Sequence, residues 1–285
     1  VSQLSAQVQA AFAAMNRIFT LLAADEEVSQ GKVDIDVDDI KGSVTFEHVQ
    51  FGYDDELLMH DVNFQVKPGQ MVAIVGPTGA GKTTLMNLLL RFYDVKGGSI
   101  KIDGTDIRDM NREDLRRLFS LVLQDTWLFS GTIFDNIRYG QLTARKDEVV
   151  DAAKMANVHH YIRTLSHGYN SMINEEANNI SQGEKQLLTI ARAILKDPRI
   201  LVLDEATSSV DTRLERMLQE AMQKVMAGRT SFVIAHRLST IRNADLILVV
   251  NNGDIIEQGT HEELLAKKGA YEKLYHSQFA NQDFD

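Results

Sequence analysis

The chain has 285 residues, a length that indicates one large domain or two small ones with room for a buried core. It carries 30 Lys and Arg against 40 Asp and Glu, and the resulting net charge of −10 argues against a protein that mainly coats nucleic acid. A content of 44% hydrophobic and 25% charged residues with 3 Pro excludes collagen-like, low-complexity and disordered proteins. The lack of Cys excludes disulfides, thiolate metal sites and a cysteine nucleophile, and it suits a cytosolic protein.

The sequence lacks the features of membrane spans and targeting segments. No apolar run reaches the length of about 18 residues that a membrane-spanning helix needs. The first residues form neither a basic-then-apolar signal peptide nor an Arg-rich transit peptide. Because the chain begins at Val1 rather than Met, we expect a soluble fragment cut from a longer protein.

An amphipathic pattern opens the chain. Apolar residues recur at spacings of three and four, which places them on one helix face: Leu4, Val8, Ala11, Phe12, Met15, Ile18, Phe19 and Leu22. This helix can pack on its own domain or continue out of a missing neighbouring domain, and we favour the second. Residues 25–42 are polar and acidic, which is typical of a solvated linker. The sequence therefore predicts a helix over 1–24, a linker over 25–42 and a domain boundary there.

Strand and helix patterns alternate in the rest of the chain. Predicted strands include residues 44–51, 64–66, 71–75, 121–123, 200–203 and 231–234, and a hairpin turn falls at 251–253. Helical patterns begin at Lys82, Arg112, Thr132, Lys146, Gln182, Arg213 and Glu262. This alternation predicts an α/β domain with a mostly parallel sheet and antiparallel edges from the hairpins.

A glycine-rich loop is the strongest local signal. Residues 76–83 (GPTGAGKT) fit G-x-x-x-x-G-K-[ST] between a buried strand and an apolar helix. Such a loop curls backbone N–H groups around phosphate oxygens, Lys82 neutralises the β and γ phosphates, and the Thr83 hydroxyl can hold Mg²⁺. A chance match is rare in this context, and a dinucleotide-binding fingerprint is excluded because Lys82 follows Gly81 and no third Gly stands at the required place.

A second signal is an apolar strand, residues 200–203, that ends in Asp204 and Glu205. Ligands of open α/β folds bind at this carboxyl edge of the sheet. Asp204 is suited to hold Mg²⁺ through its water shell, and Glu205 to take a proton from the attacking water. Alone, such an acidic pair is usually structural, but beside a phosphate loop it favours a catalytic role.

Between these two motifs, residues 179–186 (NISQGEKQ) precede an apolar helix. Together, the three motifs make the chain resemble the nucleotide-binding domain of an ATP-binding cassette transporter of the exporter type. The resemblance covers about residues 42–279, so we place the domain over 43–279 and a tail over 280–285. Its motifs follow in the family's order: Tyr53, the phosphate loop, Gln124, the signature around Ser181, Asp204 with Glu205, the turn 208–211, and His236. The run 124–133 and the N-terminal helix look like the exporter type, in which such a helix continues from the last transmembrane helix.

The resemblance implies a role for each motif residue. Tyr53 would stack on adenine, although a lone Tyr at a strand end is more often a packing residue. Gln124 would reach Mg²⁺ and the attacking water, and the alternative is an ordinary polar strand end. His236 would bond the γ-phosphate and align the water with Glu205. The implied cofactors are ATP and Mg²⁺. Catalysis is assigned to Glu205, His236 and Gln124, the metal to Thr83, Gln124 and Asp204, and nucleotide binding to Tyr53, Gly76, Pro77, Thr78, Gly79, Ala80, Gly81, Lys82, Thr83, Thr84, Ser181 and Gly183.

In this family two domains close face to face, and Ser181 with the Gly183 backbone would contact the γ-phosphate bound by the opposite domain. The signature departs from the usual Leu-Ser-Gly-Gly-Gln, because Ile180, Gln182 and Glu184 replace Leu, the first Gly and Gln. A carboxylate at Glu184 near a triphosphate is unfavourable unless it points away or pairs with Lys185. Similar departures occur in exporters built from two different halves, so we expect a non-identical partner domain rather than a symmetric homodimer.

The resemblance therefore implies a P-loop ATPase fold: a mostly parallel core sheet, an antiparallel β subdomain and a helical subdomain with the signature. The implied function is hydrolysis of ATP that drives export by a transmembrane domain absent from this chain, at the cytoplasmic face of the membrane and without nucleic acid. One alternative is a chromosome-maintenance ATPase that clamps DNA. Those proteins usually insert a long coiled coil between the phosphate loop and the signature, whereas Lys82 and Ser181 are separated here by the length of a single domain. Another is a regulatory module without turnover, which Glu205 and His236 disfavour.

Overall fold

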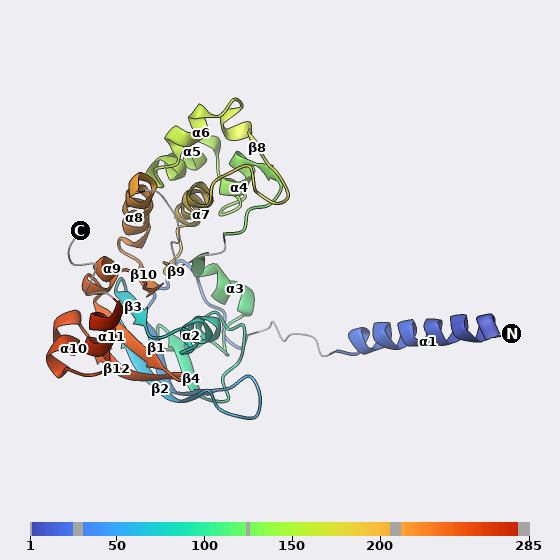
Figure 1. Ribbon diagram of the computed structural model, residues 1–285, viewed down its shortest axis with the longest axis horizontal. Coiled ribbons are helices and arrows are strands. Elements are labelled where there is room, and N and C mark those ends of the chain that lie inside the picture. The colour runs from blue at the N-terminus through green and yellow to red at the C-terminus, as the bar shows by residue number, and fades with distance from the viewer. Residues whose placement is uncertain (1, 25–30, 124–125, 206–211, 279–285) are drawn as a thin grey trace. The chain divides into compact units, whose positions relative to one another are not determined.

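The computed structural model describes residues 2–24, 31–123, 126–205 and 212–278. The chain divides into two units, residues 1–30 and 31–285. The first unit contains the predicted N-terminal helix, α1 (Ser2–Leu22), which is confirmed (Figure 1). The large apolar side chains of its predicted stripe, such as Phe12 and Phe19, are exposed. Among the described helices, none combines the length and hydropathy needed to cross a membrane.

The centre of the second unit is a six-stranded sheet in the order β12-β11-β3-β10-β9-β6. Its strands are β3 (Met71–Val75), β6 (Phe119–Val122), β9 (Ile200–Asp204), β10 (Thr230–Ile234), β11 (Leu246–Asn251) and β12 (Asp254–Gly259). All neighbours are parallel except β11 and β12, which form an antiparallel hairpin at one edge. The predicted mostly parallel sheet with an antiparallel edge is confirmed.

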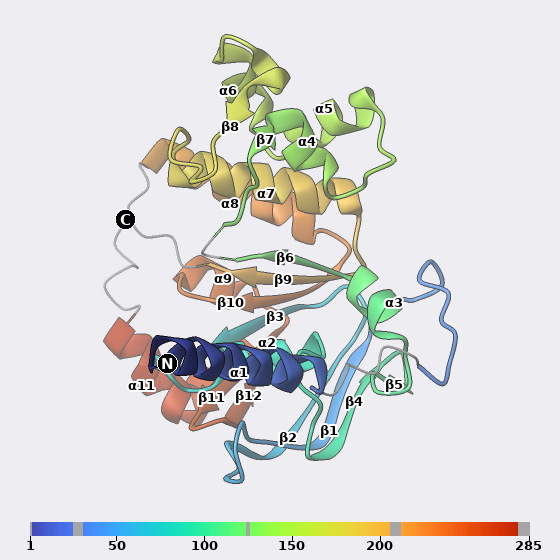
Figure 2. The same cartoon turned by 90° about the vertical axis from the view of Figure 1, so that its right-hand side faces the viewer.

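Alternate residues of the central strands face two different hydrophobic cores, as the period of two in a strand requires. Ala73 and Val75 of β3 belong to the core shared with the helices α4 to α8, whereas Val72 and Ile74 belong to the core shared with α2 and the second sheet. Figure 2 shows α7 and α8 on one face of the sheet and α2 on the other. A strand buried on both faces explains the continuous apolar run at 71–75.

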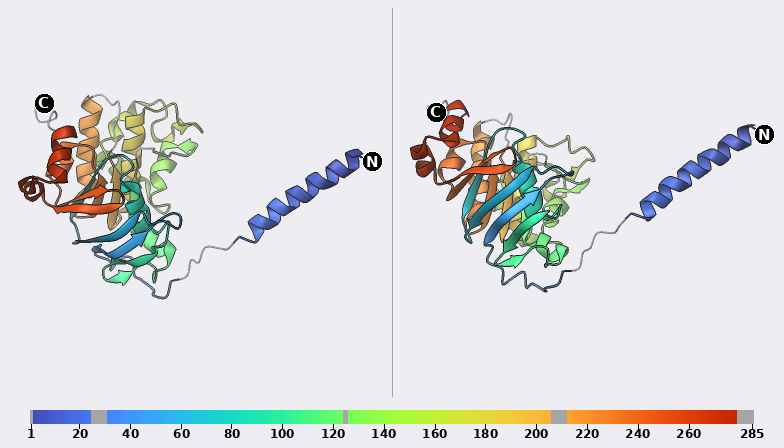
Figure 3. Two further views of the ribbon diagram at one scale, coloured as in Figure 1. Left: turned by 60° about the horizontal axis from the view of Figure 1, so that its bottom comes forward. Right: turned by 90° about the horizontal axis from the view of Figure 1, so that it is seen from below.

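The second sheet is antiparallel, in the order β2-β1-β4-β5. Its strands are β1 (Val44–Phe51), β2 (Met59–Val66), β4 (Gly97–Ile102) and β5 (Thr105–Asp106), seen side by side in blue to green in Figure 3, right. Phe46 and Phe64 stack across β1 and β2 with ring centroids 4.4 Å apart. The helices α2 (Lys82–Leu89) and α3 (Arg112–Arg117) follow the phosphate loop and β5.

A helical region covers the face of the central sheet opposite α2 and the second sheet. It contains α4 (Ile133–Arg138), α5 (Lys146–Met155), α6 (His159–Thr164), η1 (Gly168–Asn170), α7 (Gln182–Lys196) and α8 (Thr212–Met226), with the short strands β7 (Gly131–Thr132) and β8 (Met172–Ile173). The remaining helices are α9 (Leu238–Arg242), α10 (His261–Lys267) and α11 (Ala270–Gln278). The predicted helical subdomain that carries the signature is therefore present, with Ser181 at the N-terminus of α7.

Some predicted boundaries were wrong. The helices predicted from Thr132 and Glu262 begin at Ile133 and His261. The helix predicted from Arg213 is described from Thr212 onward. Thr132 instead caps α4, because its hydroxyl accepts the backbone N–H of Asp135. The strand predicted at 121–123 spans Phe119–Val122, and the one predicted at 64–66 is the end of the longer β2.

Candidate functional site

The phosphate loop, residues 76–81, connects β3 to α2 and is held by the turn of the β11–β12 hairpin. The backbone N–H of Gly253 donates to the Ala80 carbonyl at 2.8 Å. A Cβ on Gly76, whose φ is +152°, would lie 2.2 Å from the Val250 carbonyl oxygen. Gly81 has φ +101° and caps α2. Because glycine has no side chain, the first N–H groups of α2 are left for a ligand.

Lys82 points back into this loop. Its Nζ donates to the carbonyl oxygens of Gly76 at 2.7 Å and Pro77 at 2.9 Å. Burial lowers the pKa of Lys82 below its ordinary value, and the nearby Asp204 carboxylate opposes that shift. The ammonium therefore lies between the loop and the end of β9, where a bound anion would meet it.

The next two residues of α2 face different ways. Thr83 is exposed, so its hydroxyl is accessible to a ligand in front of the loop. Thr84 is 7% exposed, and its hydroxyl is 3.0 Å from the Tyr53 hydroxyl. Thr84 therefore anchors an aromatic side chain that comes from the loop after β1.

Tyr53 belongs to a small aromatic cluster next to the start of α2. Its ring makes edge contacts with Phe51 at 5.0 Å and Tyr93 at 5.1 Å between centroids. Tyr53 nevertheless remains 53% exposed. A fixed, half-exposed ring beside a phosphate loop is suited to stack on a planar base.

The carboxylates predicted at the end of β9 have different surroundings. Asp204 is half-buried and ends the strand opposite Ile234 of β10. Glu205 is 7% exposed; its Oε1 accepts a hydrogen bond from the Thr240 hydroxyl and lies 3.9 Å from Nε of Arg237. Burial raises the pKa of Glu205, and the bond from Thr240, the charge of Arg237 and the N–H groups of His236 and Arg237 counteract this.

Two residues in the surroundings of Glu205 were not identified from the sequence. Thr240 is in α9, and Glu215 of α8 pairs with Arg237 at 2.9 Å between Oε1 and Nη2. Neither residue belongs to a short motif with Glu205, so no local signal could have found them. In this structure the Glu205 carboxyl is turned toward α9.

His236 follows β10 at the same edge of the sheet and is exposed. The strand before it is fixed in register, since Ile234 of β10 lies opposite Ile74 of β3 and the Ala235 N–H donates to the Ile74 carbonyl at 3.2 Å. Gln124 and the turn 208–211 lie outside the described residues. The structure thus brings the ends of β3, β9 and β10 together, as predicted for the phosphate loop, Asp204, Glu205 and His236.

The signature forms the N-terminus of α7, and its unusual Glu184 has a structural role there. The Glu184 carboxylate accepts the Ser181 backbone N–H at 3.0 Å and the Ser181 hydroxyl at 2.7 Å, and the Glu184 N–H donates to the same hydroxyl oxygen at 3.4 Å. This is a capping box, whose S-x-x-E signal was present in the sequence. Burial and the neighbouring Glu184 carboxylate, which is also its hydrogen-bond partner, raise the pKa of Tyr161 to about 12. Glu184 is thus held by Ser181 and Tyr161 rather than by Lys185.

The other two signature residues differ in exposure. Gly183 is buried, and exposed Gln182 donates from Nε2 to the Thr126 hydroxyl at 3.4 Å. The helix that follows packs in the core shared with α4 to α8, whereas α2 packs in the core on the other face of the sheet. The signature and the phosphate loop therefore begin helices on opposite faces of one sheet.

The groups at the phosphate loop fit a nucleoside triphosphate with Mg²⁺. The open N-terminus of α2 and the Lys82 ammonium supply positive potential. The Thr83 hydroxyl and the Asp204 carboxylate are oxygen ligands of the kind that Mg²⁺ prefers. Within the described ranges, no group of three or more His, Asp and Glu side chains forms a metal site by itself.

Three comparisons place the chain among known proteins. Residues 59–208, more than half of the chain, match the family model described as "ABC transporter". The chain is 50% identical over 268 residues to the fatty acid ABC transporter ATP-binding/permease protein of Mycobacterium bovis, which covers 94% of this chain and 42% of that protein. It is 48% identical over 282 residues to the ATP-dependent lipid A-core flippase of Methylobacillus flagellatus, with 98% and 48% covered.

A solved structure of a bacterial Atm1-family ABC exporter with ATP bound is similar at a TM-score of 0.83 and 41% identity, covering 96% of this chain and 48% of that one. The chain therefore spans less than half the length of the relatives described here.

Proposed function

Because the chain belongs to the ABC transporter family, we propose that it is the ATP-binding and ATP-hydrolysing motor domain of an exporter. The observation that carries this proposal is the meeting of the phosphate loop with the carboxylates of β9, where Asp204 acts electrostatically on Lys82. Phosphoryl transfer needs positioning and charge stabilisation more than covalent chemistry, and this edge of the sheet supplies both.

ATP binding is assigned to the loop and the residues beside it. Backbone N–H groups of residues 76–84 and the Lys82 ammonium hold the phosphates, and Lys82 exchanges its bonds to the Gly76 and Pro77 carbonyls for phosphate oxygens. The half-exposed Tyr53 ring stacks on adenine.

Magnesium binding is assigned to the Thr83 hydroxyl, Asp204 and Gln124. When bound, Mg²⁺ neutralises charge on the phosphate oxygens. Asp204 is fixed at the end of β9 by its pairing with β10, whereas Gln124 lies outside the described residues.

Glu205 is the proposed general base. A base must reach the water that it deprotonates, so Glu205 leaves Thr240 and turns toward the γ-phosphate when the site closes. Its raised pKa makes the carboxylate a better proton acceptor. His236, exposed at the end of the neighbouring strand, bonds the γ-phosphate and aligns the water.

A complete site needs a second domain. Ser181 and the Gly183 backbone begin a helix on the face of the sheet opposite α2, so they are proposed to contact ATP held by a partner rather than by their own loop. The capping box leaves the Ser181 hydroxyl bonded to Glu184 in this signature. We assign the partner as a non-identical nucleotide-binding domain, since Gln182 and Glu184 weaken this signature while Lys82, Asp204, Glu205 and His236 are all in place.

The membrane part of the exporter is proposed to be a transmembrane domain of the same half-transporter. The Mycobacterium bovis relative is named an ATP-binding/permease protein, and this chain matches 42% of it. In that arrangement the motor domain works at the cytoplasmic face of the membrane. The helix α1, whose apolar face is exposed, would connect the motor domain to that transmembrane domain.

Steady-state phosphate release from MgATP by the purified chain tests the proposal. We expect release that requires Mg²⁺ and does not respond to added double-stranded DNA. Stimulation by DNA would favour the chromosome-maintenance alternative, and binding without any release, alone or with a partner domain, would favour a regulatory module.

A further inference from the structure

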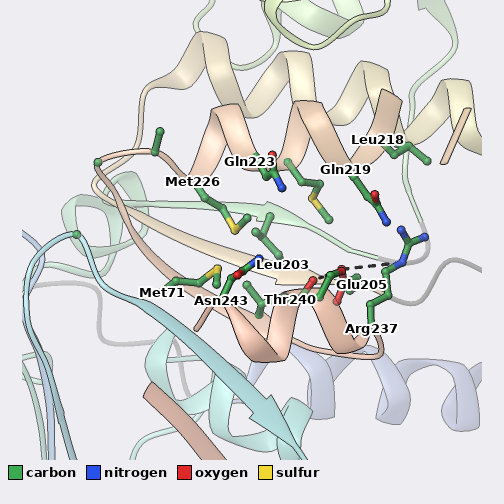
Figure 4. Close-up of a pocket in the computed structure, with 16 residues that line it drawn as sticks. Met71, Leu203, Glu205, Leu218, Gln219, Gln223, Met226, Arg237, Thr240 and Asn243 are labelled. Carbon is green, nitrogen blue, oxygen red and sulfur yellow. Dashed lines mark hydrogen bonds and ion pairs between the residues drawn. The ribbon is translucent and has the colours of Figure 1, made fainter. Parts of the chain in front are cut away.

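The structure contains a cavity of about 440 Å³ beside Glu205. It lies between α8 and α9, over residues of β9 and β10, with Met226 and Leu203 among its lining residues (Figure 4). This volume is within the range of small-molecule sites, about 300–1,000 Å³. The lining faces the core that contains α7 and α8, whereas the helix of the phosphate loop packs on the other face of the sheet. The cavity therefore lies on the face of the sheet opposite the helix of the phosphate loop, and it shares Glu205 with the proposed catalytic residues.

The two ends of the cavity differ chemically. Figure 4 shows Met71 and Met226 at one end, with the polar side chains of Asn243 and Gln223 beside them, and Glu205 with Thr240 and Arg237 at the other. Methionine side chains adapt to irregular apolar ligands. Methionine sulfurs also make favourable contacts with aromatic rings, so the methionine end is suited to a flat aromatic ring system.

The polar end has an unsatisfied group. Thr240 and Arg237 both contact Oε1 of Glu205, and the backbone N–H groups of His236 and Arg237 act on the carboxylate, whereas Oε2 is buried and forms no hydrogen bond among the described residues. A buried oxygen without a partner is unfavourable, so a ligand that bonds to it gains affinity. Glu205 is also 7% exposed, so water has little access to the residue.

We propose that this cavity binds a neutral aromatic carboxamide, and that the bound ligand slows ATP hydrolysis by holding Glu205 away from the nucleotide. The aromatic ring lies among the methionines, and the amide N–H donates to Oε2 of an ionised Glu205. If Glu205 is protonated, its O–H donates to the amide carbonyl instead, so the same ligand fits both states. The effect on hydrolysis rests on the proposed function, in which Glu205 must leave Thr240 to act as base.

The binding test uses 2-naphthamide as the probe and calorimetry on the nucleotide-free chain. We expect saturable binding, and binding about tenfold weaker for 2-naphthoate, which has the same ring but places a carboxylate against Glu205. Absence of 2-naphthamide binding at millimolar concentration, or equal affinity for both probes, would overturn the proposal.

Variants locate the site. Met226→Trp and, at the exposed rim, Ala227→Trp fill the cavity and should weaken binding by about tenfold or more, with cooperative thermal melting as the check of folding. Lys224→Trp adds the same ring to α8 outside the cavity lining and should bind like the wild type. Undiminished binding by both filled variants would place the probe elsewhere and reject the cavity.

The hydrolysis test uses the same proteins with MgATP. We expect 2-naphthamide to lower the maximal rate of phosphate release without changing ATP affinity, and the two filled variants to resist this inhibition. Inhibition that ATP competes away would contradict the mechanism. If the wild type releases no phosphate, alone or with a partner domain, the proposed function fails, but the calorimetric result still decides whether the cavity binds the probe.

Discussion

Lys82 is a partly buried cation that bonds two carbonyl oxygens of its own loop. Those carbonyls carry only partial charge, so a phosphate oxygen is a stronger partner for the ammonium. Burial already lowers the pKa of Lys82, which means that the folded chain holds this charge at a cost and would gain from an anion.

Lys82→Ala should therefore abolish MgATP binding or weaken it by about tenfold or more, since a hydrogen bond to a charged group is worth about 1.5–3 kcal/mol. Calorimetry with MgATP measures the effect. Lys67→Ala, which removes an exposed lysine from a turn, is the matched control and should bind normally. Equal affinity of the two variants would mean that the loop is not the nucleotide site.

The ionised side chain of Glu205 lowers the stability of the folded chain. Burial raises its pKa above the ordinary 4.5, so the folded chain binds the proton more tightly than the unfolded chain. Stability is then lost as pH rises from the ordinary value through the raised one, and the loss persists above it.

Glu205→Gln removes this ionisation and should raise the melting temperature by a few degrees at neutral pH. The gain should disappear near about pH 4, where Glu205 is protonated in both states. Thermal melts across pH measure it, with Glu56→Gln as a control at an exposed carboxylate. A gain that is independent of pH would show that the charge of Glu205 is not its source.

At the scale of elements, the β11–β12 hairpin sets the position of the phosphate loop. Asn252 and Gly253 form its two-residue turn, and both have positive φ, +47° and +86°. The Gly253 N–H holds the Ala80 carbonyl, and a Cβ on Gly253 would lie 1.9 Å from the Leu58 carbonyl oxygen. The turn therefore links the edge of the sheet to the nucleotide site.

Gly253→Ala should lower the free energy of unfolding by about 1–3 kcal/mol and also weaken MgATP binding, because the turn must move away from Leu58 and Ala80. Asn252→Gly, one residue earlier, relieves a positive φ and should retain both properties. Denaturant titration and calorimetry on the two variants give the comparison. Unchanged ATP affinity in a destabilised Gly253→Ala would show that the hairpin supports the fold but not the loop.

The sequence predicted elements well where local signals are strong. The helix at Lys82 follows Gly81, and the helix at Gln182 follows the cap Ser181, so both starts were predicted correctly. β4 begins with two glycines and was not predicted, since its strand conformation depends on pairing with β1. The short α6 (His159–Thr164) was also missed, because six residues are too few to show a helical period.

In the candidate site, too, some features could be predicted from the sequence and others could not. The phosphate loop and the Asp204-Glu205 pair are short motifs at the ends of strands, so their placement at one sheet edge could be predicted. The direction of the Glu205 side chain could not, because its partner Thr240 is 35 residues away and reaches it only through the packing of α9. The cavity beside Glu205 also could not be predicted, because it depends on how α8 and α9 pack in the fold.

At the scale of the whole molecule, the signature and the phosphate loop begin helices on opposite faces of one sheet, which favours sites shared between two domains. In a shared site, Glu184 of this chain would approach a γ-phosphate held by the partner. At an effective dielectric near 20, such a carboxylate costs on the order of a few kcal/mol. Its bonds to Ser181 orient it toward the helix cap and reduce that cost.

The chain alone should therefore hydrolyse ATP slowly, and a non-identical partner domain should raise the specific activity. Changing Gln182→Gly and Glu184→Gln together should raise the activity of the chain alone by about tenfold, while Gln keeps the capping box. Glu175→Gln, a nearby exposed carboxylate, is the control. Fast cooperative hydrolysis by the unmodified chain, or no gain from a partner, would leave a homodimer with an unusual signature.

The most direct test of the account compares MgATP binding and phosphate release for the wild type and Glu205→Gln, measured on the same preparations. The substitution keeps the shape of the side chain and removes the base. The account predicts unchanged ATP affinity with a fall in hydrolysis of about 10² to 10⁴. Hydrolysis by Glu205→Gln at the wild-type rate would contradict it.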